Sequence, residues 1–514
     1  MKLKVRTLYI EAGGRPIVVL NKEDAKSLGI HAVDRIEIKY KDKRLVAITN
    51  ISTIFPEGYI GLYKEVCEQL KVSAGEEVDV KAAHRPASTR YIQAKIHGKR
   101  LLEHEIKTII RDVVERRISD IELSAFVTAL YIHGSSMNEK EALTKAMVET
   151  GKKLNIKKKP ILDKHSIGGI PGDKTTIVLV PIVAAAGYTI PKTSSRAITS
   201  PAGTADRMEV LCPVNLSLEE IKEVISKVNA CIVWGGALDL APADDLFIQV
   251  EYPLAIDPLL LPSIISKKKA MGADYVVIDI PTGREAKIKT IDEAHELAKE
   301  FIELGKRLGM NIQCAITFGE QPLGYAIGPA LEAKEALLTL MGKGPEDLEE
   351  KAINLAGILF EMVGESNGKK KAREILRKGL AERKLREIIE AQGGNPKIKI
   401  EDIPIGREKA IITAAKEGRI VWINNRDIAH LARTAGAPKD KGAGILLNVK
   451  LGDYVKKGDK LFTIYAERLT KLEEAIKLTE QLEVIGISKD IRDLMLIERI
   501  PTEKIHEKTF ILER

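Results

Sequence analysis

The chain of 514 residues is long enough for three or four domains, and its 44% hydrophobic content is ordinary for a globular protein. No apolar run approaches the roughly 20 residues of a membrane span, and the N-terminus has no signal-peptide pattern, so we expect a cytoplasmic protein. The net charge of +8, with both signs interspersed, suits a small anionic substrate and does not predict nucleic-acid or membrane binding.

Residues 1–84 read as a β-rich N-terminal domain. Short alternating runs such as RIEIKY and RLVAIT are separated by polar turns, which favours hairpins or a compact barrel over helices. We expect a double-psi-like barrel that serves assembly or stability rather than catalysis.

Residues 85–160 read as a small all-α lobe. Apolar residues recur at helical spacing in EHEIKTIIRDVVERR and SDIELSAFVTALYIHG, and Ser119 with Glu122 forms a predicted capping box. A third helix, MNEKEALTKAMVETG, follows. We expect the segment of about 208–230, which contains SLEEIKEVISKVNA, to complete this lobe.

Residues 161–345 read as an α/β domain that binds phosphate. A short strand runs into a loop with Gly168, Gly169 and Gly172, and an apolar helix follows. Unpaired N–H groups and a helix dipole at such a turn suit an oxyanion, although glycine loops of this kind are also plain tight turns. A second strand, TIPKT, leads into a second small-residue loop, SSRAITSPAGT, which we expect to lie beside the first.

The combination of these loops carries a family resemblance. DKHSxGG, GDKT, SxR and AGTxD in this order resemble the signature of the thymidine and pyrimidine-nucleoside phosphorylases, and most closely that of archaeal members that act on AMP. The N-terminal extension is similar to that of the same archaeal members. The resemblance implies phosphorolysis of an N-glycosidic bond, in which phosphate attacks C1 of the ribose and the base leaves with a proton.

The resemblance also implies the phosphate-binding residues. No metal and no cofactor is expected, because hydroxyl, amide and ammonium donors hold inorganic phosphate as the co-substrate. The residues at the family's phosphate positions and in the first loop are Lys164, Ser166, Gly168, Gly169, Thr176, Ser194 and Thr204.

Departures from the family pattern indicate which base leaves. Val250 stands where pyrimidine-specific members have an arginine, and an apolar side chain cannot donate to a pyrimidine oxygen. A purine needs a proton donor, and the resemblance assigns this role to Asp257, with Ser263 and Lys267 contacting the base. We expect burial among neighbouring prolines and leucines to raise the pKa of Asp257. An aspartate before a proline is alternatively a plain helix-start residue.

A nucleotide substrate requires a second anion site, for its 5′-phosphate. We expect the second loop and one lysine beyond the next strand to supply it: Ser195, Arg196, Ala197, Ile198, Thr199, Ser200 and Lys287. The arginine fork fits phosphate oxygens, although Arg196 is alternatively a salt-bridged scaffold residue. The products would be adenine and ribose 1,5-bisphosphate.

Residues 346–514 read as a C-terminal α+β domain. GAGILLNVKLGDYVKKGDKLFTIYAE resembles the hammerhead-like barrel that closes these phosphorylases, and it lacks the Met-Lys-Met sequence that holds a carrier lysine at the hairpin tip. We therefore expect a structural domain. The whole chain is then a multidomain α/β protein with a β barrel, a helical lobe, a central α/β domain and a hammerhead-like end.

We expect a phosphorylase that prefers AMP and also accepts CMP or UMP. Two alternatives to this function stay open. One is a thymidine or pyrimidine-nucleoside phosphorylase, and the other is a non-catalytic nucleic-acid-binding protein on the same scaffold. The resemblance further implies a homodimer through the helical lobe, and we allow for higher assembly through the N-terminal domain.

Overall fold

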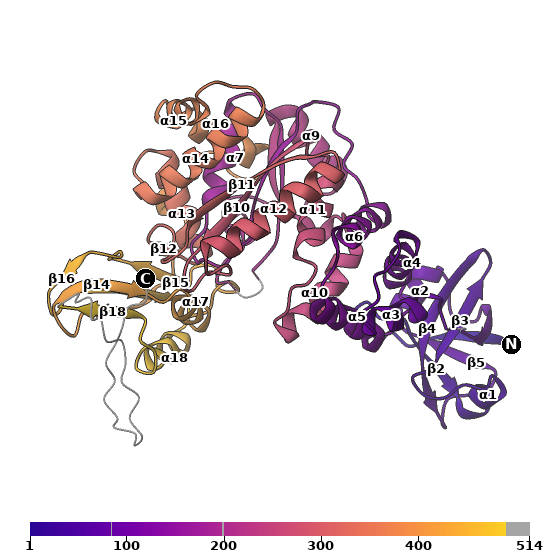
Figure 1. Cartoon of the computed structure of the whole chain (residues 1–514). Helices are drawn as coiled ribbons and strands as arrows, with labels where there is room; N and C mark the ends of the chain where they lie inside the picture. Colours follow the sequence, from indigo (N-terminus) through magenta and orange to yellow (C-terminus); the bar gives the residue numbers. More distant parts are fainter. Residues whose placement is uncertain (84, 198–199, 490–514) are drawn as a thin grey trace, which may run out of the picture. The chain divides into compact units, whose positions relative to one another are not determined.

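The computed structural model describes residues 1–83, 85–197 and 200–489 (Figure 1). The chain forms two compact units. The first unit comprises Met1–Ile161, Gly235–Val276 and Lys299–Ile312. The second comprises Leu162–Trp234, Val277–Ala298 and the chain from Gln313 onward.

The first unit begins with a closed six-stranded barrel, which confirms the β-rich barrel predicted from the sequence. The strands follow the order β1-β5-β2-β4-β3-β6, with β1 parallel to β5 and β2 parallel to β4. Alternate residues such as Val18 and Leu20 point into the core. The barrel elements are β1 Lys2–Thr7, β2 Ile17–Asn21, α1 Lys22–Ser27, β3 Arg35–Tyr40, β4 Lys43–Ser52, β5 Tyr59–Leu62, α2 Lys64–Leu70 and β6 Glu77–Ala82.

The helical lobe of the first unit contains the three predicted helices. Ser119 and Glu122 form the predicted capping box, with reciprocal hydrogen bonds of 3.2 and 2.7 Å between side chain and backbone. The lobe comprises α3 Ser88–Ile96, α4 Glu103–Val114, α5 Asp120–His133, α6 Met137–Thr150, α10 Pro242–Leu254 and α11 Leu260–Ala270. α10 packs on α4, α5 and α6, and α11 packs on α6.

The prediction that residues of about 208–230 complete this lobe is wrong. The helix in that segment, α9 (Leu218–Val228), belongs to the second unit and packs on β9 and α16. Its buried stripe of Ile221, Val224 and Ile225 matches the buried strand that follows it. α10 and α11 complete the helical lobe instead.

The second unit is built around α7, in which every residue from Thr175 to Ala184 is buried. α7 packs on β8 and β9 and on α13, α14, α15 and α16; these four helices lie around α7 in Figure 1. One sheet has the order β11-β10-β7, and β8 pairs with β9 in parallel. The unit boundaries fall within β10, β11 and α12.

The strands of this α/β region are β7 Leu162–Ser166, β8 Ile190–Ser194, β9 Ala230–Trp234, β10 Tyr275–Thr282, β11 Asn311–Phe318 and β12 Ala326–Ile327. Its helices are α7 Thr175–Ala185, α8 Thr204–Met208, α12 Ile291–Arg307, α13 Pro329–Leu340, α14 Glu346–Met362, α15 Gly368–Arg377 and α16 Leu380–Ala391. Because α14, α15 and α16 cover α7, the predicted start of the C-terminal domain at residue 346 is wrong. These helices bury the apolar helix that the phosphate loop leads into.

The C-terminal part consists of two antiparallel sheets with two helices. The sheet orders are β12-β15-β17-β13 and β16-β14-β18. The elements after α16 are β13 Glu408–Thr413, β14 Gly418–Ile423, α17 Asn425–Thr434, β15 Gly444–Leu447, β16 Tyr454–Val455, β17 Lys460–Ala466, α18 Leu469–Thr479 and β18 Ile485–Ser488. The likeness to a hammerhead stays a prediction. Within the part of the chain that the structure describes, no helix has the length and apolar character needed to cross a membrane.

Candidate active site

The first loop, residues 167–174, joins β7 to α7 in the predicted order of strand, glycine loop and helix. Gly168 and Gly169 have φ values of +82° and +100°, which only glycine adopts without strain. A Cβ on Gly169 would lie 2.5 Å from the backbone nitrogen of Lys287, whereas one on Gly168 would meet nothing within 4 Å. The loop therefore lies directly against the segment that carries Lys287, whose side chain is exposed.

A carboxylate caps the start of α7. Asp173 accepts hydrogen bonds from the Thr175 backbone N–H at 3.2 Å and from its hydroxyl at 2.6 Å. Thr176 is buried in the same first turn, and the Ser166 hydroxyl accepts a 3.4 Å hydrogen bond from the Gly168 N–H. The Thr175 N–H, one of the groups expected to face a phosphate, is thus hydrogen-bonded to Asp173.

Two lysines and two aspartates form a buried charge cluster beneath this loop. Lys164 Nζ lies 3.5 Å from Asp279 Oδ2 and 3.8 Å from Asp173 Oδ2. Lys351 Nζ lies 2.9 and 3.8 Å from the same two carboxylate oxygens. Burial alone would raise the pKa of Asp173, yet Lys164 and Lys351 hold that pKa well below its ordinary value. Asp173 is therefore an anion, and Lys164 stands between two acidic groups.

The second loop, residues 195–203, follows β8. Ser194 donates a hydrogen bond of 3.1 Å to the carbonyl of Val233, and Ser200 donates one of 3.2 Å to that of Ala202. The Ala197 N–H donates to Asp206 at 2.7 Å. Ile198 and Thr199 lie outside the described residues.

Arg196, predicted at the 5′-phosphate site, is ion-paired in the structure. Its guanidinium donates to both carboxylate oxygens of Glu209 at 2.7 and 2.5 Å and lies 5.0 Å from the centre of the Trp234 ring. Glu209 also pairs with Lys441 at 2.8 Å. This geometry favours the scaffold alternative for Arg196.

Arg207 links the two loops, which confirms that they lie side by side. It donates to the carbonyl of Asp173 at 2.8 Å and to that of Ala202 at 2.7 Å, and it contacts the Thr204 hydroxyl at 3.4 Å. Its counterion is Glu332, 2.5 Å away and fully buried. The second loop is therefore fixed to the first by a buried arginine.

The lysine of the GDKT motif points away from the cluster, towards the segment before α13. Lys174 is fully buried and donates to the carbonyls of Leu323 and Ala326 at 2.8 and 2.9 Å. Its carboxylate partner is Glu335, at 2.5 Å. This lysine holds the first loop on the chain that leads into α13.

The residues predicted to address the base fall in the first unit. Ser263 and Lys267 lie one turn apart on α11, as predicted, and Lys267 Nζ pairs with buried Asp244 at 2.5 Å. Burial opposes the ammonium charge, but Asp244 outweighs it and raises the pKa of Lys267. Val250 is buried in the core of the helical lobe, so it presents no donor.

Asp257 lies in the short connection between α10 and α11, and its predicted burial is wrong. The side chain is exposed, and Leu254, expected to cover it, is 51% exposed. Asp245, in the first turn of α10, is a second carboxylate of the first unit. Desolvation raises the pKa of Asp245 to about 6 against the opposing charge of Lys267, although the residue is exposed to solvent.

The sequence reading missed Asp279, Lys351 and Arg207. Asp279 is the one charged residue of the apolar strand segment YVVIDI, Lys351 precedes the apolar run AINLAGILF, and Arg207 lies in the short helix α8. A charge in such a place is rarely buried unless it is paired, and this was the available signal.

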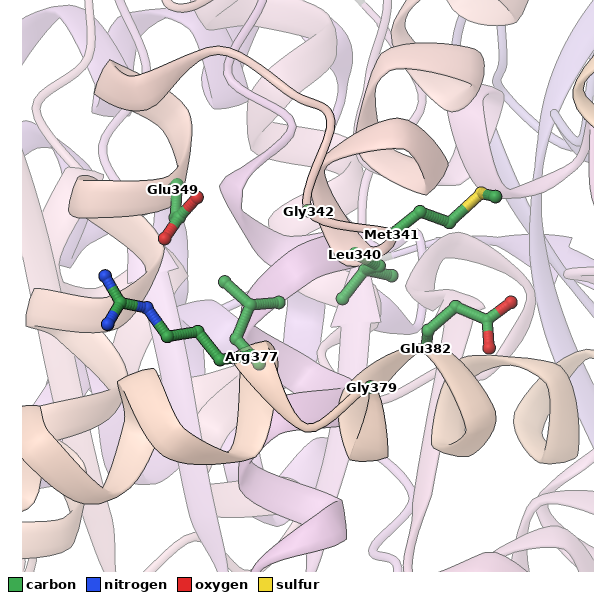
Figure 2. A pocket seen from close by; sticks show the side chains of 8 residues that line it. Leu340, Met341, Gly342, Glu349, Arg377, Gly379 and Glu382 are labelled. Atoms are coloured by element: carbon green, nitrogen blue, oxygen red, sulfur yellow. The ribbon is translucent and has the colours of Figure 1, made fainter.

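The second unit has a cavity near the ends of α13 and α15 and another beside the charge cluster. Figure 2 shows one of about 520 Å³, lined by the ends of α13 and α15 and the starts of α14 and α16, and none of the predicted site residues lines it. The other, of about 570 Å³, lies between β11 and α14 and is lined by Thr317 and Lys351 of the charge cluster region. Among the described residues, no group of three or more His, Cys, Asp or Glu side chains is arranged to hold a metal ion.

Family models match three parts of the chain. They are a glycosyl transferase family helical bundle domain at residues 89–151, the a/b domain of that family at 158–382, and a pyrimidine nucleoside phosphorylase C-terminal domain at 420–485. A solved anthranilate phosphoribosyltransferase from Thermus thermophilus superposes with a TM-score of 0.51 at 21% identity, over 59% of this chain and 98% of its own, and so shares the fold. The fold and the paired loops thus define a glycosyltransferase of the nucleoside phosphorylase type.

Curated relatives narrow the family further. The chain is 48% identical to the AMP phosphorylase of Thermofilum pendens over 100% of both chains. It is 54% identical to that of Thermococcus kodakarensis over 97% of this chain and 99% of the relative. AMP phosphorylase 1 of Archaeoglobus fulgidus is 48% identical over 92% and 95%. The chain belongs to the AMP phosphorylase family.

Proposed function

We propose that this protein catalyses the phosphorolysis of AMP to adenine and ribose 1,5-bisphosphate. The observation that carries the proposal is the pair of loops joined by Arg207, with a buried lysine, Lys164, beneath the first. Together with membership in the AMP phosphorylase family, this arrangement supports a site that presents phosphate to a ribosyl carbon.

In the proposed reaction a phosphate oxygen bonds to C1′ as the bond from C1′ to N9 of adenine breaks. The bonding electrons pass to the purine, which takes up a proton on a ring nitrogen. The ribosyl carbon gains positive charge in the transition state, and the phosphate anion on its far face stabilises that charge. Lys164, Ser166 and the first-loop amides are the proposed phosphate ligands, with Thr176, Ser194 and Thr204 beside them.

The 5′-phosphate is proposed to bind Lys287 and the second loop, including Ser195 and Ser200. Lys287 is exposed and its backbone touches Gly169, so a ligand there would lie next to the attacking phosphate. Arg196 supports this loop through Glu209 rather than by binding the nucleotide itself.

Asp257 is the proposed proton donor, and Ser263 and Lys267 are proposed to contact the base. A pyrimidine-nucleoside phosphorylase is the second candidate, and Val250 argues against it because a buried valine offers no hydrogen bond to a pyrimidine carbonyl.

The test compares phosphate-dependent base release from AMP, CMP, UMP, adenosine and thymidine. We expect AMP to be the preferred substrate and adenosine to be turned over poorly. Thymidine as the best substrate would refute the proposal and establish the second candidate.

The same assay identifies the acid through two matched variants. Asp257→Asn should lower kcat for AMP by about 100-fold or more, within the range for loss of a general acid, whereas Asp245→Asn should retain most of kcat. The reverse ranking would assign the proton to Asp245.

We also propose that the protein is a homodimer through the helical lobe. Helix α5 exposes the large apolar side chains of Ile121, Tyr131 and Ile132 at 81%, 59% and 67%, and these side chains are available to an interface. Light scattering should give twice the mass of one chain, and Ile132→Asp should lower that mass; a monomeric wild-type protein would contradict the proposal.

A further inference from the structure

Lys351 is a buried cation on α14 that none of the proposed reaction steps uses. Its side chain is 7% exposed, and its neighbours along the helix, including Ala352 and Leu355, are core residues. Burying an ammonium in such surroundings is costly unless an opposite charge is close. Opposite charges are indeed close: Lys351 Nζ lies 2.9 Å from a carboxylate oxygen of Asp279 and 3.8 Å from one of Asp173.

The same two carboxylates flank Lys164, the proposed phosphate ligand. Lys164 Nζ is 3.5 Å from Asp279 and 3.8 Å from Asp173, so the two lysines share both acids and the four groups sum to zero charge. Hydroxyl groups complete the cluster, since Thr317 donates to Asp279 and Thr175 donates to Asp173, each at 2.6 Å.

The two aspartates favour the charged form of Lys351. Burial disfavours the charge on Lys351, but Asp173 and Asp279 outweigh it and raise the pKa of Lys351. Lys351 thus remains an ammonium at neutral pH.

A phosphate anion and two aspartates compete for Lys164. Without a second cation, drawing Lys164 towards phosphate would leave Asp173 and Asp279 buried, close to the incoming anion and uncompensated. With Lys351 in place, one ammonium stays 2.9 Å from Asp279 while the other turns to the phosphate.

We propose that Lys351 is a positioning residue for phosphate binding: it neutralises the Asp173–Asp279 pair and so releases the Lys164 ammonium for the co-substrate. The inference rests on the proposed function through the role given to Lys164. Lys351 itself does not touch the phosphate, and its contribution passes through the two aspartates.

The test measures steady-state kinetics and phosphate binding for Lys351→Met and Lys351→Gln in the full-length protein. Both variants leave the cluster with a charge of −1, so KM for phosphate should rise about tenfold or more while KM for AMP changes less than about threefold. Titration calorimetry with inorganic phosphate alone should show the same loss of affinity. The control is Lys95→Met, an equally buried lysine paired with Glu139 at 2.7 Å in the helical lobe, which should leave the phosphate KM unchanged.

A second substitution distinguishes whether Lys351 affects the phosphate KM through its charge or through its packing. Adding Asp279→Asn to Lys351→Met restores a neutral cluster, and the phosphate KM should return to within about threefold of wild type. A purely structural role for Lys351 predicts the opposite, because the double variant loses two buried groups and should be worse than either single one.

Three results would overturn the inference: an unchanged phosphate KM in both Lys351 variants, an equal rise in the KM of both substrates, or a double variant weaker than Lys351→Met. Failure of the proposed function is distinguishable, since wild-type protein would then release no adenine from AMP. The calorimetric comparison of phosphate binding would still decide the role of Lys351.

Discussion

Gly169 offers a direct test of how closely the first loop must approach the Lys287 segment, because Gly168 beside it is a matched control. At either position an alanine must adopt a positive φ, which costs on the order of 1–2 kcal/mol of conformational free energy. Only at Gly169 does the new Cβ also collide, at 2.5 Å from the Lys287 nitrogen and 2.9 Å from its Cβ.

The collision sets the size of the effect. Carbon atoms are not found closer than 3.0 Å to such atoms, so the loop and the Lys287 segment must separate by at least 0.5 Å and by more for ordinary contact. A displacement of about 1 Å at a site that positions reactants costs on the order of 100-fold in rate. We therefore expect Gly169→Ala to lower kcat/KM for phosphate about 100-fold, and Gly168→Ala to lower it less than about tenfold.

The assay is initial-rate adenine release with phosphate varied at saturating AMP, accompanied by thermal unfolding of each variant. Comparable unfolding temperatures with unequal kcat/KM would locate the effect in loop position rather than in stability. Equal losses of activity in the two variants would refute the reasoning, because the contact with Lys287 would then have no consequence beyond the φ strain.

Two further predictions concern buried ion pairs. Glu332→Gln leaves Arg207 buried without its carboxylate, so it should destabilise the α/β region by about 3–5 kcal/mol, and an unchanged thermal unfolding midpoint would contradict this. In the helical lobe, burial opposes the charge on Glu139, but Lys95 and nearby N–H donors lower its pKa from 4.5 to about 2. Because the folded pKa is the lower one, Glu139 should contribute about 3 kcal/mol above pH 4.5 that is lost as the pH falls towards 2. Denaturant unfolding between pH 6 and pH 3 should show this loss in wild type and much less of it in Glu139→Gln.

Local patterns in the sequence predicted the local structure well. The capping box at Ser119, the strand and helix on either side of Gly168 and Gly169, and the alternating strands of the N-terminal barrel each depend on residues close together in the chain. Side-chain periodicity and φ requirements are set over a few residues, so the sequence displays them directly.

Long-range electrostatic partners were not predictable in the same way. Lys351 and Asp279 are far from Lys164 in the chain, and only the pairing of β10 with β7 and the packing of α14 on α7 bring them together. Arg196 shows the same limit, because its sequence context fits a phosphate or a carboxylate partner equally and does not reveal its hydrogen bond with Glu209.

The errors about α9 and Asp257 have a related cause. The amphipathic pattern of α9 predicts that it buries one face but does not say against which layer, and the adjacent strand β9 decided the outcome. For Asp257, the apolar residues that precede it in sequence do not cover its side chain. Leu254, at the end of α10, is itself turned to the surface.

The measurement that tests the central claim most directly is the product balance of AMP cleavage with and without inorganic phosphate. Phosphorolysis predicts that adenine appears only when phosphate is present, together with one equivalent of ribose 1,5-bisphosphate, which phosphorus NMR distinguishes from ribose 5-phosphate. Adenine release that does not need phosphate, with ribose 5-phosphate as the sugar product, would show a hydrolase and contradict the account.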